Sequence, residues 1–140
     1  MPLAGQRTTS GMFLWAENTD RCCQLNKTLP LEPVLAQSDV WITGVRRDQS
    51  ATRAGFEFEA PGPHGVIRLH PMLEWTKQDV WRWVTTHDLP RHPLELQGYD
   101  SIGCGPCTAK PSLDGERDGR WGGMNKTECG LHTTLATATN

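Results

Sequence analysis

A stretch of about thirty residues, 101–132, contains most of the side chains that are suited to chemistry. Cys104 and Cys107 form a Cys-x-x-Cys pair, and a further thiol, Cys129, stands three residues before His132. Thiolates bind soft metals and are also the reactive form of cysteine in nucleophilic attack. The stretch therefore combines a candidate metal site with a candidate nucleophile.

Two groups of arginines provide candidate anion sites. Arg117 and Arg120 are one helical turn apart within the same stretch. Arg46, Arg47 and Arg53 follow directly after an expected strand. Ligands of an open α/β sheet bind beyond the carboxyl ends of its strands, so this second group stands where an anionic ligand is expected. A solvated loop is the alternative for any single arginine of the group.

Cys22 and Cys23 supply two further soft ligands, which join Cys104 and Cys107 as a set of four. Four thiolates complete a [4Fe-4S] cluster, and a structural zinc ion also accepts four. Adjacent cysteines point about 100° apart on a helix and suit two corners of a cluster better than one tetrahedral ion. A strained disulfide between Cys22 and Cys23, or a redox dithiol of Cys104 and Cys107, are the alternatives.

Composition limits the remaining possibilities. At 140 residues with 36% apolar content, the chain is long enough for one domain with a modest core. A net charge of -2 and a pI near 6.2 do not favour nucleic-acid binding. No apolar run is long enough for a signal peptide or a spanning helix, which predicts a soluble, cytoplasmic protein without membrane contact. Five cysteines, an odd number, favour a metal site plus one free thiol in a reducing compartment.

Several elements must position these residues. Residues 40–43 and 66–69 predict two short strands, the first of them buried. Thr76 and Asp79 match a capping box, which predicts a helix up to about His87. Trp81 and Trp83 lie in that helix without a flanking basic stripe, so we expect core packing rather than a stacking platform.

The two ends of the chain carry fewer signals. Residues 1–19 have no clear periodicity and are expected to be loosely ordered. Asp20 is a plausible N-cap of a short helix that Pro30 limits. Residues 20–108 are expected to form the α/β core with the metal ligands. Residues 109–140 are rich in Gly and charge, which predicts a mobile tail that carries Cys129.

The motifs together are more specific than their separate chemistry. They are Cys22-Cys23 with Lys27, Gly-x-Arg-Arg-Asp-Gln-Ser at 44–50, Gly-Tyr-x-Ser-Ile-Gly-Cys-x-Pro-Cys-Thr at 98–108, Gly-Arg-Trp at 119–121 and Glu-Cys-Gly-Leu-His at 128–132. In this order the chain resembles the assimilatory adenylyl-sulfate reductases of the phosphoadenylyl-sulfate reductase family. The resemblance covers about residues 20–132.

That resemblance implies a function and a fold. The function is thioredoxin-dependent reduction of adenosine 5'-phosphosulfate to sulfite and AMP in sulfate assimilation and cysteine biosynthesis. Relatives that use the 3'-phosphorylated substrate share the terminal motif but usually lack the cluster cysteines, so the simple adenylyl form is the expected substrate. The fold implied is an α/β open parallel sheet of the adenine-nucleotide alpha-hydrolase type, and a homo-oligomer is a further expectation.

The resemblance also implies roles for single residues. Cys22, Cys23, Cys104 and Cys107 match the ligands of a [4Fe-4S] cluster, and Lys27 matches a lysine near cluster and substrate sulfate. The arginines that match phosphosulfate-binding positions are Arg53, Arg117 and Arg120. Cys129 matches the nucleophile, which becomes an S-sulfocysteine, and His132 stands beside it in the same motif.

The sequence departs from the family pattern in two places. The family has a Ser-Gly-Gly phosphate loop in a preceding half, and this sequence has no Gly-rich phosphate loop, so we expect it to correspond to the C-terminal part. Trp121 is followed by Gly122 and Gly123, and the link to Cys129 is shorter than is common. Two other functions therefore stay open: a non-catalytic, metal-stabilised fragment, and a zinc-binding interaction module.

Overall fold

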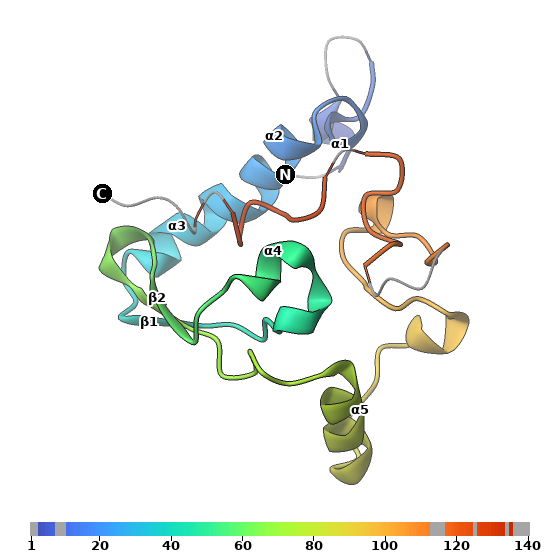
Figure 1. The fold of residues 1–140 in the computed structure, drawn as a ribbon. Coiled ribbons are helices and arrows are strands. Elements are labelled where there is room, and N and C mark those ends of the chain that lie inside the picture. Colours follow the sequence, from blue (N-terminus) through green and yellow to red (C-terminus); the bar gives the residue numbers. More distant parts are fainter. Residues whose placement is uncertain (1–2, 8–10, 113–116, 125, 134, 136–140) are drawn as a thin grey trace. The chain divides into compact units, whose positions relative to one another are not determined.

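The computed structural model describes residues 3–7, 11–112, 117–124, 126–133 and 135. The chain forms two compact units, and Figure 1 shows the path of the chain through both. Unit 1 consists of Met1–Trp41, Glu59–Leu69 and Glu128–Asn140, and unit 2 of Ile42–Phe58 and His70–Thr127. Helices and short strands both occur, which confirms the expected α/β class. The tail expected to be mobile lies partly outside the described residues, at 113–116, 125, 134 and 136–140.

Unit 1 begins with a series of short helices. They are a 3-10 turn at Leu3–Gln6, α1 at Leu14–Glu17, α2 at Thr19–Cys23, a π-helical turn at Gln24–Thr28 and α3 at Leu29–Leu35. From α2 to α3 these elements follow one another without a break (Figure 1). The helix that carries the paired cysteines is therefore longer than the sequence predicted.

The two boundary signals expected for this helix were wrong. Asn18, rather than Asp20, is the N-cap, and its side chain accepts a hydrogen bond of 2.9 Å from the backbone N of Arg21. Pro30 does not limit the helix, because it occupies the first turn of α3. A proline is tolerated there, since that position needs no backbone N–H.

A small sheet completes unit 1. In the described part of the chain it has three strands, β1 at Val40–Ile42, β2 at Glu59–Pro61 and β3 at Ile67–Leu69, in the order β1-β3-β2. β2 and β3 pair antiparallel, with Ala60 opposite Arg68. This pair differs from the expected parallel sheet because a tight connection through Pro63–Gly65 joins the two strands, and parallel strands need a long crossover. β2 itself was missed, since the sequence patterns predicted strands only at 40–43 and 66–69.

The first strand is not buried as predicted. β1 is an edge strand of this sheet, and Val40 and Ile42 are 44% and 67% exposed. The apolar interior of unit 1 lies instead around the helices and the C-terminal segment, where the buried side chains include Cys23, Leu35 and Leu135. The apolar run at 40–43 correctly predicted a strand, but it did not show which side of that strand other residues cover.

Unit 2 contains two α-helices among its described residues and is otherwise built from turns. α4 spans Ala51–Ala54 and α5 spans Lys77–Thr86, and 3-10 turns occur at Arg47–Gln49, Glu95–Gln97 and Gly105–Cys107. The predicted capping box of α5 is confirmed: Asp79 N donates to Thr76 Oγ1, and Thr76 N donates to Asp79 Oδ2. The bond that the Asp79 carboxylate accepts from Thr76 N, together with one from Thr76 Oγ1, holds the pKa of this carboxyl below its ordinary value.

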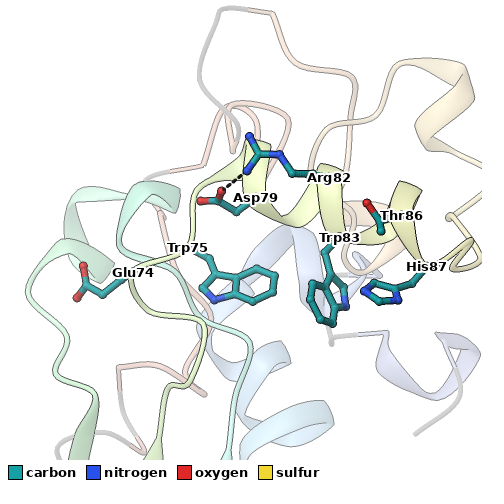
Figure 2. A pocket seen from close by; sticks show the side chains of 7 residues that line it. All are labelled: Glu74, Trp75, Asp79, Arg82, Trp83, Thr86 and His87. Atoms are coloured by element: carbon teal, nitrogen blue, oxygen red, sulfur yellow. Dashed lines mark hydrogen bonds and ion pairs between the residues drawn. The ribbon is translucent and has the colours of Figure 1, made fainter.

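The tryptophans of α5 do not pack in a core, which corrects the sequence prediction. Trp81 and Trp83 are 58% and 51% exposed. Figure 2 shows Trp83 beside Trp75 and His87 in an open pocket of about 390 Å³, and the Trp75 and Trp83 rings meet edge to face at 5.7 Å. α5 is amphipathic, but few described side chains of unit 2 cover its apolar face.

None of the described helices combines the length and the apolar content that crossing a lipid bilayer requires.

Candidate functional site

A polar pocket in unit 2 brings together two motifs that are about seventy residues apart in the sequence. It has a volume of about 490 Å³ and is lined by the turn at 48–50 and by residues 117, 118, 120–124, 126 and 127. Arg117, Arg120 and Lys126 are its cations, and Asp48 and Asp118 its carboxylates. The structure therefore brings the two predicted arginines of the second motif to one cavity.

Trp121 holds these two arginines. Its indole is 2% exposed, and Cζ of Arg120 and of Arg117 lie 4.5 Å and 5.5 Å from the centre of its ring system. A guanidinium at such a distance is attracted by the negative face of the ring. Trp121 also has a left-handed backbone with φ of 51°, which a non-glycine residue adopts only where its surroundings enforce it.

Hydrogen bonds fix the Cys-x-x-Cys loop to the arginine loop within unit 2. Trp121 N donates to Cys107 O at 3.0 Å, and Ala109 N donates to Gly119 O at 2.7 Å. Thr108 and Arg120 form an isolated antiparallel bridge. Candidate metal ligands and candidate anion ligands thus belong to one hydrogen-bonded assembly.

Arg46 and Arg53 lie in unit 2 but do not line this pocket. Both are buried, and Arg46 Nε forms an ion pair of 2.9 Å with Asp48. Gln49 connects them: its Oε1 accepts from Arg46 N at 3.2 Å and also from Arg53 Nη1. The side chain of Gln49 lies at the pocket wall, so the two arginines support the wall rather than form it.

The cysteine pairs divide between the units. Unit 1 has Cys22, half-buried, and Cys23, buried, whereas unit 2 has Cys104, exposed, and Cys107, buried. All are free thiols. Among the residues described, no three or more His, Cys, Asp or Glu side chains form a group that could hold a metal ion. The structure thus shows two thiol pairs, one in each unit.

Around Cys22 a small polar network orders the helix. Asn26 Nδ2 donates to Cys22 O at 2.9 Å and lies 3.6 Å from Cys22 Sγ, and it also contacts Gln6 Oε1 at 3.1 Å. Lys27 follows in the π turn and is half-buried. The thiol and the predicted lysine are therefore on one continuous helical segment.

Cys129 belongs to unit 1, where its segment forms tight turns. His132 N donates to Cys129 O at 3.2 Å, and Leu135 N donates to Gly130 O at 3.0 Å. The His132 ring stacks on Trp41 with 6.4 Å between centroids and 9° between planes. The Cys129 side chain is buried, so the candidate nucleophile is covered in this conformation.

Comparison with known proteins gives the family of this chain. Residues 4–110 match the model of the phosphoadenosine phosphosulfate reductase domain. The chain belongs to this reductase family. The resemblance stated from the sequence motifs is thereby confirmed.

Curated relatives give a closer comparison. Adenosine 5'-phosphosulfate reductases from Salinibacter ruber and Bacillus cytotoxicus are 45% and 46% identical over 137 and 134 residues. These alignments cover 96% and 94% of this chain but only 54% and 57% of the relatives. One from Anoxybacillus flavithermus is 43% identical over 134 residues, or 94% of this chain and 57% of that protein. The chain therefore spans about half the length of the curated reductases it matches.

Sequence reasoning missed three residues of the candidate site. Trp121 was read only as part of the Gly-Arg-Trp motif, because its contacts with Arg117 and Arg120 depend on a turn that no sequence pattern predicted. Gln49 and Lys126 had no pattern of their own, because their roles depend on contacts between distant segments.

Proposed function

We propose that the protein reduces adenosine 5'-phosphosulfate to sulfite and AMP, with Cys129 as the nucleophile. The observation that carries this proposal is the pocket of Arg117, Arg120 and Lys126, which suits an anionic ligand. The relatives named above are adenosine 5'-phosphosulfate reductases, and this substrate carries a phosphate and a sulfate joined by one oxygen. The chain spans only part of those enzymes, so activity of these 140 residues alone is part of the proposal.

The proposed reaction has two steps. The thiolate of Cys129 attacks the sulfur of the phosphosulfate, a bond from sulfur to sulfur forms, and the bond from sulfur to the bridging oxygen breaks as AMP leaves. A thioredoxin thiolate then attacks Sγ of Cys129 and releases sulfite, and the second thiol of thioredoxin resolves the mixed disulfide. Two electrons pass from the dithiol to the sulfur, and thioredoxin ends as a disulfide.

The cations are needed because the attack brings two anions together. Arg117 and Arg120 are suited to bidentate contact with the phosphate and sulfate oxygens. Lys27 would neutralise the sulfate oxygens as a point charge, and we propose that Arg53 and Arg46 support the same ligand through the Gln49 wall. His132 adjoins Cys129 in the tail motif and is proposed to hold its segment in position.

We further propose that Cys22, Cys23, Cys104 and Cys107 hold a [4Fe-4S] cluster. The donor set fits such a group, because all four are free thiols and thiolates are the ligands that iron-sulfur clusters take. When bound, the cluster would tie the helix of Cys22 and Cys23 to the loop of Cys104 and Cys107 through its four thiolate ligands. A cytoplasmic location suits this proposal, since a reducing compartment keeps the thiols free.

The test uses the complete chain, purified without oxygen and mixed with adenosine 5'-phosphosulfate in the absence of thioredoxin. We expect Cys129 to gain one sulfonate group by mass spectrometry, and added thioredoxin to release it as sulfite. Cys129→Ser should show no modification and keep its iron. Sulfonation that persists in Cys129→Ser would exclude the proposed nucleophile.

Metal analysis of the same sample separates the alternatives. About four irons and four sulfides per chain support the cluster. A colourless protein with one zinc supports the zinc-binding interaction module. Intact cluster without sulfonation supports a non-catalytic, metal-stabilised fragment. The polar pocket gives the reductase the stronger case, because neither alternative requires three cations at one cavity.

A further inference from the structure

The side chain of Arg120 occupies the space where any other residue at position 103 would place its Cβ. A Cβ built on Gly103 would lie 2.8 Å from Nη1 of Arg120 and still closer to Nη2 and Cζ. Real Cβ atoms do not approach other heavy atoms so closely, so a side chain at position 103 would displace the guanidinium, the end of a flexible side chain, from its place 4.5 Å from the centre of the Trp121 ring. Gly103 is thus in direct contact with a pocket cation.

The neighbouring glycine behaves differently. A Cβ built on Gly105, two residues further along the same loop, meets nothing within 4 Å. Its backbone does not adopt a positive φ either. The loop therefore contains one glycine whose missing side chain makes room for Arg120, and one that can accept a side chain.

The loop that carries Gly103 is itself held in place. Gly103 N donates to Thr108 Oγ1 at 3.0 Å, and Thr108 Oγ1 donates in turn to Cys104 O at 3.0 Å. Because Thr108 also pairs with Arg120 through the isolated bridge, the backbone of Gly103 is tied to the segment whose side chain it contacts. A shift of Gly103 away from the guanidinium would break these bonds.

Arg120 can supply a positive charge to a ligand in the pocket. Its Nε is buried, and among the described residues its side chain makes no hydrogen bond or ion pair, although it lines the polar pocket. A buried N–H donor without an acceptor is costly unless a ligand completes it. Arg120 contacts Gly103 and Trp121, and these contacts fix the orientation of its guanidinium. The N–H donors of the guanidinium then determine the direction from which an anion can bind.

We propose that Gly103 is a positioning residue: its lack of a side chain seats the Arg120 guanidinium against Trp121 and so shapes the pocket for a tetrahedral oxyanion. This inference rests on the proposed function only for the identity of that anion, the phosphosulfate group. The role belongs to Gly103 through Arg120, and not to the Cys-x-x-Cys loop in general.

The test compares Gly103→Ala with Gly105→Ala in the complete chain. The Nε–Hε signals of arginine side chains, observed by ¹⁵N NMR, report the position of Arg120, since a nearby indole shifts them by its ring current. Inorganic sulfate is the binding probe, titrated against the same signals. We expect Gly105→Ala to match the unchanged protein. Gly103→Ala should lose the ring-current shift of Arg120 and bind sulfate on the order of tenfold more weakly, as for one lost charge-assisted hydrogen bond.

A double-mutant cycle separates positioning from a general structural effect. In an Arg120→Ala background, Gly103→Ala should reduce sulfate affinity no further, because the group that it displaces is absent. If Gly103→Ala alone does not fold, the same background should restore folding by removing the clash. An unshifted Arg120 signal in the unchanged protein, or an equal loss of affinity in both backgrounds, would overturn the inference.

The outcome is distinct from that of the reductase assay. A protein that shows the predicted Arg120 shifts but no sulfonation of Cys129 keeps the positioning role and loses the proposed function. A protein that sulfonates Cys129 while Gly103→Ala leaves Arg120 unmoved keeps the function and loses the positioning role.

Discussion

The two thiol-bearing regions of this chain are held by different means. In unit 1, Cys22 and Cys23 are on a helix, and their order comes from local hydrogen bonds such as that from Asn26 to Cys22 O. In unit 2, Cys104 and Cys107 are on an irregular loop, and their order comes from distant contacts such as that of Trp121 with Cys107 O. Local order survives small changes in packing, whereas the loop depends on one buried ring.

The largest effect should follow removal of that ring. Trp121→Ala takes away a side chain that is 2% exposed and the platform of two arginines, and should lower the free energy of unfolding of unit 2 by about 3 to 5 kcal/mol. Amide hydrogen exchange reports each unit separately. Trp81→Ala, at a position 58% exposed, is the matched control and should change stability by less than about 0.5 kcal/mol. An equal loss of stability in both units would mean that the two thiol-bearing regions unfold together. It would contradict the difference described between them.

A smaller effect is expected from the local network of unit 1. Asn26→Ala removes hydrogen bonds to Gln6 and Cys22 and should destabilise the α2 segment by about 1 to 2 kcal/mol. The amides of unit 2 should exchange as before. Gln24→Ala, which changes an exposed side chain two residues before Asn26, serves as the control. A variant at position 26 as stable as this control would show that the helix alone orders the thiols.

The contact between Trp41 and His132 should control access to Cys129. An aromatic pair contributes about 0.5 to 1.5 kcal/mol, so Trp41→Ala should raise the rate at which a thiol reagent labels Cys129 roughly two- to tenfold. Labelling of Cys104, which is already exposed, provides the internal reference. An unchanged ratio of the two rates would mean that other contacts cover the Cys129 thiol.

The smallest effect concerns acid. Because the folded pKa of Asp79 is lowered, its contribution to the cap of α5 is fully present above the unfolded pKa of about 3.9 and is lost as the pH falls through the folded value. The protection of the α5 amides, taken relative to their intrinsic exchange rate at each pH, should therefore fall below about pH 4, with little change in unit 1. Asp79→Asn should remove most of this dependence. If the pH dependence persisted in that variant, another carboxylate would be responsible.

Local signals in the sequence predicted local structure well. The capping box of Thr76 and Asp79 gave α5 its start, and an apolar run gave β3. Sequence patterns failed to predict the structure where it depends on contacts with residues far away in the chain. β2 was missed because its pairing with β3 depends on a turn, and the exposure of Trp81 and Trp83 depends on what covers α5.

The candidate site shows the same limit. Residue types alone made Arg117, Arg120 and Cys129 candidates, and the structure places the two arginines at one pocket. The sequence could not place Arg46 and Arg53 behind the pocket wall, because Gln49 connects them through hydrogen bonds that leave no periodic pattern. Nor could the sequence predict that Trp121 packs against Arg117 and Arg120, because that packing depends on a left-handed backbone and a buried ring.

The π-helical turn Gln24–Thr28 restricts how this part of the chain can change in length. Residues five apart align in a π turn, as residues four apart do in an α-helix, and Lys27 follows Cys22 by five. Deleting one residue here would let α2 and α3 close into an ordinary α-helix, and everything after the deletion would rotate by about 100° relative to the thiols. Substitutions on the exposed side of this segment should therefore be tolerated far better than a single insertion or deletion, which would turn Lys27 and Leu35 to new faces.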